Sequence, residues 1–143
     1  MKFMSCYVQP VNGKFTIDLS HKTDCFIALS EISVPNINSG GQQQNSIDIK
    51  CDQINSTFEN PKRLLKRICF NRLKSRGDQY YNQWDANFLD FQQIDTNQKV
   101  LSFSITRTIG GAPIEFSDVV QDKKIFFTLA LKPYEETDRW SCI

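Results

Sequence analysis

Histidine is almost absent from this chain, with His21 the single one in 143 residues. Catalytic cysteine–histidine pairs and zinc sites need such ligands close together, and the five cysteines are widely spaced with no Cys-x-x-Cys pair. A phosphate-binding loop is also missing, because neither Gly-Gly pair is followed by Lys-Ser or Lys-Thr. Spacing alone leaves a pairing of His21 with a cysteine open, but we favour an exposed turn histidine. We expect no enzyme, no metal and no cofactor.

No apolar run approaches the roughly 20 residues that cross a bilayer, and the chain does not open with the charged and apolar regions of a secretion signal. The cysteine count is odd, which favours reduced, buried thiols over a disulfide framework. These cysteines are Cys6, Cys25, Cys51, Cys69 and Cys142. With 17 basic and 16 acidic residues, the net charge of +1 gives no overall attraction to nucleic acid or membrane. We expect a protein without a membrane span that is not secreted.

Aromatic residues, by contrast, are plentiful: 11 Phe, 4 Tyr and 2 Trp favour half-buried pleated surfaces. Short runs of alternating apolar and polar residues recur, separated by turn residues. The runs lie at residues 1–8, 14–19, 25–34, 46–54, 88–94, 100–106 and 124–132. The last run is nearly all apolar, as in a central strand buried on both faces. This pattern predicts an all-β fold, a single jelly-roll sandwich of about eight antiparallel strands, in one domain spanning 1–143.

Three local patterns make sharper predictions. Asn12-Gly13, between the first two runs, is a strong hairpin signal. In the third run, Ile27, Leu29 and Glu31 alternate onto one face of the strand. The segment 60–76 fits a helix that begins at Asn60-Pro61 as well as it fits a strand.

A basic strip without any acidic residue lies in the same segment. It consists of Lys62, Arg63, Lys66, Arg67, Arg72, Lys74 and Arg76. One interpretation is a surface that faces nucleic acid. The alternative, which we favour for a near-neutral domain, is a solvated face balanced by acidic residues elsewhere, such as Glu135 and Glu136 of a neighbouring subunit.

An aromatic cluster, Tyr80, Tyr81 and Trp84 with Phe88, follows the basic strip. Such residues are favoured in protein interfaces and in ligand platforms. The simpler interpretation is a long loop that folds over the open edge of the sandwich. Trp140 in the polar C-terminal tail is a further candidate contact.

The order of motifs resembles that of a known family. The segments IALSEISVP (27–35), IDIKCDQI (47–54) and LLKRICF (64–70) precede a Gly-Asp loop with aromatic residues. The segments LSFSITRTIGGAPIEF and KIFFTLALKP close the series. From residue 25 to 133 the chain resembles the penton or minor capsid protein, a single jelly roll, of Polinton/Maverick-like viruses and virophages.

The resemblance implies homopentamers at the vertices of an icosahedral shell, beside a double jelly-roll major capsid protein and around packaged nucleic acid. It also implies a strand at 64–70, no catalytic residue, and residence in the virion capsid after assembly in the host cytoplasm or nucleus. Residues 1–9 and 134–143 would be terminal arms that reach neighbours. Two alternatives stay open: a β-sandwich module that binds a glycan or peptide through the aromatic cluster, and a nucleic-acid-binding accessory protein that uses the basic strip.

Overall fold

The computed structural model of the protein describes residues 1–19, 25–35, 46–70, 72–76, 79–94, 99–114 and 123–133. The strands are β1 (Lys2–Val8), β2 (Lys14–Asp18), β3 (Cys25–Pro35), β4 (Ser46–Cys51), β5 (Leu64–Cys69), β6 (Arg72–Arg76), β7 (Gln79–Asp85), β8 (Gln92–Gln93), β9 (Val100–Arg107) and β10 (Ile125–Pro133). Within these ranges there is no helix, and thus none long and apolar enough to cross a membrane. The all-β prediction is confirmed.

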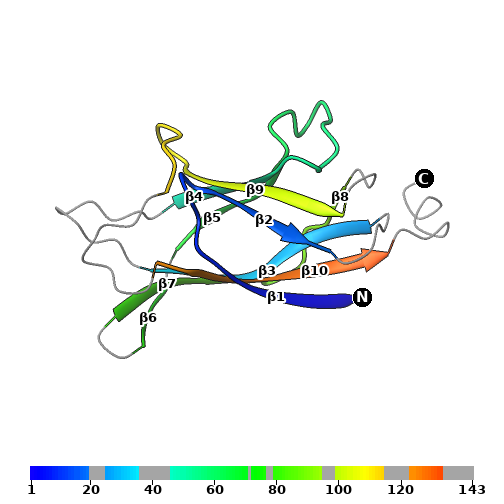
Figure 1. Ribbon diagram of the computed structural model, residues 1–143. Coiled ribbons are helices and arrows are strands. Elements are labelled where there is room, and N and C mark those ends of the chain that lie inside the picture. Colours follow the sequence, from blue (N-terminus) through cyan, green and yellow to red (C-terminus); the bar gives the residue numbers. More distant parts are fainter. Residues whose placement is uncertain are drawn as a thin grey trace.

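The strands form two facing antiparallel sheets (Figure 1). One has the order β1-β10-β3-β7-β6, with β8 also paired to β3, and the other has the order β2-β9-β4-β5. Early strands pair with late ones: β1 with β10, β2 with β9, β3 with β7 and β8, and β4 with β5. This nested pairing, rolled up so that successive pairs lie in opposite sheets, is the eight-stranded jelly roll. The predicted fold class is confirmed, with β6 and the short β8 in addition.

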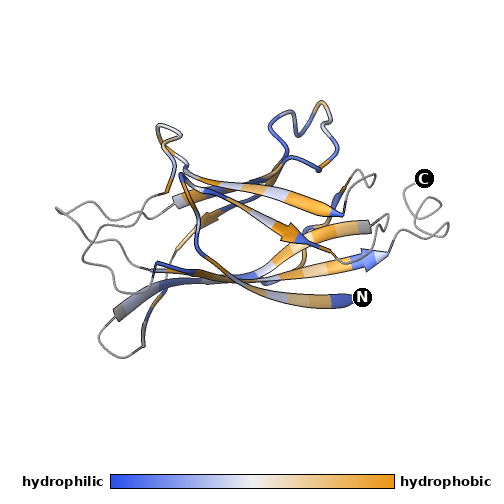
Figure 2. Cartoon of the chain, in the orientation of Figure 1, coloured by the Kyte–Doolittle hydropathy of each residue, from blue (hydrophilic) through white to orange (hydrophobic). Residues whose placement is uncertain are grey.

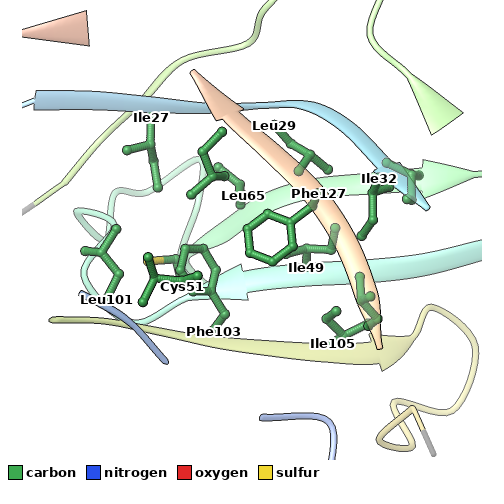
Figure 3. Close-up of a cluster of buried hydrophobic side chains, with 14 of the residues drawn as sticks. Ile27, Leu29, Ile32, Ile49, Cys51, Leu65, Leu101, Phe103, Ile105 and Phe127 are labelled. Carbon is green, nitrogen blue, oxygen red and sulfur yellow. The ribbon is translucent and has the colours of Figure 1, made fainter. Parts of the chain in front are cut away.

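The core fills the space between the two sheets, where apolar side chains from both inner faces interdigitate (Figure 3). Apolar and polar residues alternate along most strands (Figure 2). Because successive side chains of a strand point to opposite faces, this alternation places polar residues on the outer faces. Phe15 stacks on Phe103 across the β2–β9 pair, with 5.2 Å between ring centroids. The ring of Phe127 on the opposite sheet lies 5.4 Å from that of Phe15 and ties the sheets together.

The last described strand, β10, occupies the interior of its sheet. It pairs along its length with β1 on one side and with β3 on the other. Ile125, Phe127 and Leu129 face the core, while Thr128 and Ala130 on the other face are also buried. The prediction of a central strand at 124–132 is therefore confirmed.

The Asn12-Gly13 turn forms, but the predicted hairpin does not. Val11 and Lys14 exchange backbone hydrogen bonds of 3.0 Å, and both turn residues have positive φ. Gly13 is required, since a Cβ there would lie 2.6 Å from the Ile105 carbonyl oxygen. Beyond the turn, β1 and β2 diverge into opposite sheets because each finds its partner late in the chain. The hairpin prediction was correct for the turn and wrong for the pairing.

The region 60–94 differs most from expectation. The ambiguous segment 60–76 forms strands β5 and β6, not a helix. Residues 79–85, expected to be a loop, form β7, and the strand expected at 88–94 shrinks to Gln92–Gln93. In both cases pairing with a distant strand, β3, decides the outcome.

A β-bulge in β3 changes the phase of that strand. Leu29 pairs with Leu129, but Glu31 pairs with Thr128, so Ser30 has no partner of its own on β10. The extra residue turns Ile32 and Val34 toward the core together with the residues before the bulge. The prediction that Glu31 shares a face with Leu29 was wrong, because strict alternation cannot anticipate a bulge.

Substitutions at two isoleucines four residues apart can test which residues form the core. Ile105 on β9 is fully buried, whereas Ile109 in the turn that follows is 88% exposed. We expect Ile105→Ala to lower the free energy of unfolding by about 2–5 kcal/mol, because it leaves a cavity between the sheets. Ile109→Ala should change it by less than about 0.5 kcal/mol. Denaturant unfolding measures both, and equal effects would contradict the placement of the core.

Candidate functional site

The aromatic residues of β7 do not form one platform. Tyr80 and Trp84 lie on the face of the strand that points toward the opposite sheet, and Tyr81 lies on the other face, opposite Pro35. Tyr80 is 56% exposed, Tyr81 is 5% exposed, and Trp84 packs against the core at the edge of the sandwich. Of the three, only Tyr80 is thus placed to meet a partner with most of its ring.

Trp84 belongs to a small cluster that closes the open side of the sandwich between β5 and β7. Lys66 on β5 pairs with Ile49 and shares its inward face. The Lys66 ammonium lies 6.0 Å from the centroid of the Trp84 ring, 5.8 Å from that of Phe88, and 3.6 Å from a carboxylate oxygen of Asp90. These contacts link the two sheets through a cation held against aromatic faces.

Phe88 and Asp90 lie in a detour of the chain, residues 86–91, between β7 and β8. Both strands pair with β3, β7 with residues 31–35 and β8 with Phe26 and Ile27, so together they form one interrupted strand. The Ala86 amide donates to the Ser30 carbonyl at 2.9 Å, opposite the bulge, where the chain leaves the sheet. Lys66 therefore holds the detour against the other sheet.

A second cation of the basic strip is neutralised on the outer face of the β2-β9-β4-β5 sheet. Arg67 donates two hydrogen bonds to the Asp48 carboxylate, at 2.8 and 3.0 Å, across the β4–β5 pair. Thr108 donates a third at 2.9 Å and receives one from Ser46 at 2.8 Å. The bonds from Arg67 are the main reason why the pKa of this carboxyl lies below its usual range, although burial opposes them.

The rest of the basic strip is divided between separate places. Arg63, in the turn before β5, donates to the Asp52 carbonyl at 2.7 Å. On the other sheet, Arg72 forms an ion pair with Asp85 on β7. Lys62, in the turn, and Lys74, on β6, are both exposed, and Arg76 ends β6. The strip is continuous in sequence, but its members reach two sheets and several directions.

A polar row crosses the outer face of the β1-β10-β3-β7-β6 sheet. Ser5 bonds to Thr128 at 3.2 Å, and Thr128 donates to the Glu31 carboxylate at 2.9 Å. Asp85, directly opposite Glu31, accepts a hydrogen bond of 3.0 Å from Gln83 and pairs with Arg72. Facing carboxylates repel each other, so the donors around them stabilise this arrangement.

The β6–β7 hairpin, at one end of the sandwich (Figure 1), exposes apolar side chains. Leu73 is 54% exposed and lies diagonally across from Tyr80, on the side of the hairpin that carries Trp84. We call Leu73 and Tyr80 the hairpin patch. Leu73 was not among the contact residues predicted from the sequence. Its exposure follows from the position of β6 at the edge of its sheet.

An open hollow of about 670 Å³ lies over β2 and β9. Its lining residues are Val11, Lys14, Phe15, Thr16, Asp52, Ser102, Phe103 and Ser104. None of the aromatic residues proposed from sequence as a ligand platform lines it. This hollow is therefore not part of a glycan or peptide site at Tyr80, Tyr81 and Trp84.

The described residues contain no group of three or more His, Cys, Asp or Glu that could hold a metal ion. Of the cysteines whose burial the structure describes, Cys51 is buried, as predicted, Cys6 is half-buried, and Cys69 is exposed, contrary to the prediction. Burial raises the pKa of the Cys6 thiol, which makes it a poorer nucleophile. His21, Trp140, Glu135 and Glu136, together with the predicted arm at 134–143, lie outside the described residues. Residues 2–8 of the other predicted arm form β1, paired along its length with β10.

The site thus belongs to a jelly-roll domain whose distinctive features are sheet edges and exposed patches. Comparison of the chain with models of known protein families, with curated proteins and with solved structures finds no match.

The Asp48–Arg67 pair predicts a specific pH dependence. Because the pKa of Asp48 is lower in the folded than in the unfolded chain, its ion pair stabilises the fold above pH about 4, the usual pKa of Asp, and this stabilisation fades as the pH falls through the lowered value. The difference in unfolding free energy between wild type and Asp48→Asn should therefore be largest near pH 7 and shrink below pH 4. Urea unfolding at several pH values measures it. A difference that is the same at pH 3 and pH 7 would contradict this role of Arg67.

Proposed function

We propose that this protein is a structural, non-enzymatic subunit that forms homopentameric vertex capsomers of an icosahedral virus-like shell. The observation that carries the proposal is the strand order, β1-β10-β3-β7 facing β2-β9-β4-β5, of a single jelly roll. Viral capsid proteins, lectins and cupins use this architecture. Since fold alone does not define function, the choice among them depends on the surfaces.

The surfaces favour assembly over ligand binding or chemistry. The three aromatic residues that a binding module would use point to opposite faces of β7. The hairpin patch instead offers an exposed leucine and tyrosine beside charged residues, and tyrosine is enriched at protein contacts. A wedge-shaped domain with free sheet edges is suited to a ring, in which each copy uses the same heterologous contact.

The basic strip supports nucleic-acid binding only weakly. Lys66, Arg67 and Arg72 each have an acidic partner within the same chain. Counterion release from a phosphate backbone requires cations that are free to meet it. In the proposed shell, the remaining exposed cations would face packaged nucleic acid or an acidic neighbour such as the double jelly-roll major capsid protein. The particle would assemble in the cytoplasm or nucleus of the host.

Light scattering of the purified protein, at low and high salt, tests the proposal. We expect a species of about five times the 16.5 kDa mass of one chain. High salt should change the protein concentration at which half of the chains are assembled only modestly. The reason is that the ion pairs described above lie within the subunit. A monomer at every concentration, also after mixing with a double jelly-roll capsid protein, would overturn the proposal.

The hairpin patch predicts where the ring contact lies. Leu73→Glu places a charge in the apolar contact and should raise the concentration needed for assembly by at least about tenfold, a loss of roughly 1.4 kcal/mol. Phe58→Glu is the matched control, because Phe58 is fully exposed in the β4–β5 loop away from β6 and β7. Assembly of Leu73→Glu at the wild-type concentration would remove the hairpin patch from the interface.

A further inference from the structure

The free edges of the two sheets are protected unequally. The edge strand β6 carries Arg72 and Lys74, β5 carries Lys66 and Arg67, and the short β2 begins and ends with a charge, Lys14 and Asp18. Charges of this kind are how sheet edges avoid pairing with other chains. The fourth edge, β1, has one charge, Lys2, at its first position.

The edge strand β1 is well suited to pair with a strand from another chain. Its seven residues contain no proline, and their register with β10 is continuous from Lys2 to Val8 without a bulge. Among the described strands, β10 alone pairs with it. Phe3 and Tyr7, on its outer face, remain 55% and 50% exposed. A regular and apolar edge of this length, which no other described strand covers, is expected to bind a strand.

The order of side chains along β1 is symmetric about Ser5. Aromatic residues stand two positions to either side, Phe3 and Tyr7, and sulfur-containing residues stand one position to either side, Met4 and Cys6. The outer-face residues are Phe3, Ser5 and Tyr7, and the inner-face residues are Met4, Cys6 and Val8. An antiparallel partner with the same sequence, centred on the same serine, would therefore place aromatic residues opposite aromatic residues. It would likewise place sulfur-containing residues opposite sulfur-containing residues.

We propose that β1 pairs antiparallel with β1 of a second copy of this chain, about a twofold axis at Ser5. In this register Phe3 lies opposite the partner's Tyr7, and Met4 lies opposite the partner's Cys6. The two aromatic pairs stack on the outer face, where directly opposite side chains approach within about 5 Å. The small serine leaves room at the axis, and the net charge of +1 opposes self-association only slightly.

This contact is distinct from the ring of five. A twofold contact uses the same patch on both copies and joins only two of them, so it cannot close a pentamer. The ring was assigned to the hairpin patch on β6 and β7, at the other edge of the same sheet. The twofold contact would join subunits of neighbouring rings, or pair free subunits, into one continuous sheet.

Disulfide trapping tests the register directly. In the variant Met4→Cys, the new thiol would face the partner's Cys6, with Cα atoms about 4.5–5.5 Å apart, within the range for a disulfide. Mild oxidation should convert most of the protein to a covalent dimer of twice the 16.5 kDa chain mass. Its digest should contain peptides in which the introduced thiol of one chain is linked to Cys6 of the other. The double variant Met4→Cys/Cys6→Ser is the matched control and should lose this linkage.

A second variant tests the contact without a new cysteine. Ser5→Lys sets two lysines against each other at the axis and should weaken dimerisation roughly fivefold or more, as measured by sedimentation. Ser56→Lys is the control, since Ser56 is an exposed serine in the β4–β5 loop and belongs to neither proposed contact, and it should leave dimerisation unchanged. Thermal unfolding confirms that both variants fold.

The outcomes separate this inference from the proposed function. Absence of the disulfide between the introduced thiol and Cys6, together with unchanged association of Ser5→Lys, overturns the twofold contact even if pentamers form. The same disulfide in a protein that never forms pentamers supports the twofold contact and counts against the capsomer. Disulfides that join other cysteines in place of this pair show a different register and also overturn the proposal.

Discussion

The insertion of β10 between β1 and β3 is the interaction on which the rest of the architecture depends. This strand supplies the backbone partners of both neighbours and buries Ile125, Phe127 and Leu129 between the sheets. Without it, β1 has no described partner and β3 keeps only β7 and β8. Because the strand lies late in the chain, the sheet closes only when distant segments meet, which makes folding slow compared with that of local hairpins. The same closure leaves β1 and β6 as the two edges of this sheet.

Charge in this protein acts locally. Asp48 with Arg67 joins β4 to β5, Arg72 with Asp85 joins β6 to β7, and Lys66 with Asp90 closes the open side of the sandwich. The Lys66–Asp90 and Arg72–Asp85 pairs are partly exposed, and such pairs contribute little to stability one by one. The effect of the three pairs is to neutralise three cations of the basic strip within the subunit.

The free sheet edges and the exposed patches together favour a function in assembly. A jelly roll presents two ends and several sheet edges, and this chain leaves the hairpin patch and the aromatic face of β1 exposed. A ring contact and a twofold contact differ in symmetry and can coexist on one subunit. A shell needs contacts of more than one symmetry, and a soluble binding module needs neither.

Local pattern and long-range pairing each account for part of what is seen. Period-2 alternation correctly predicts most strands and the core residues of β4, β9 and β10, because the pleat alone sends alternate side chains to opposite faces. Alternation fails at Ser30 and at Leu65, because a bulge shifts the phase at each position and a bulge depends on the opposing strand. For the same reason the aromatic and basic residues were identified from the sequence, but their distribution over faces and sheets was not.

The sequence by itself determined the all-β class, the turn at Asn12-Gly13 and the central character of β10, since each depends on residues within a few positions of one another. The tertiary structure alone decided which strands pair, that β7 is a strand, and that β1 remains an edge. These outcomes depend on residues far apart in the chain, such as Ser5 and Thr128, which are 123 positions apart and whose meeting no local pattern encodes.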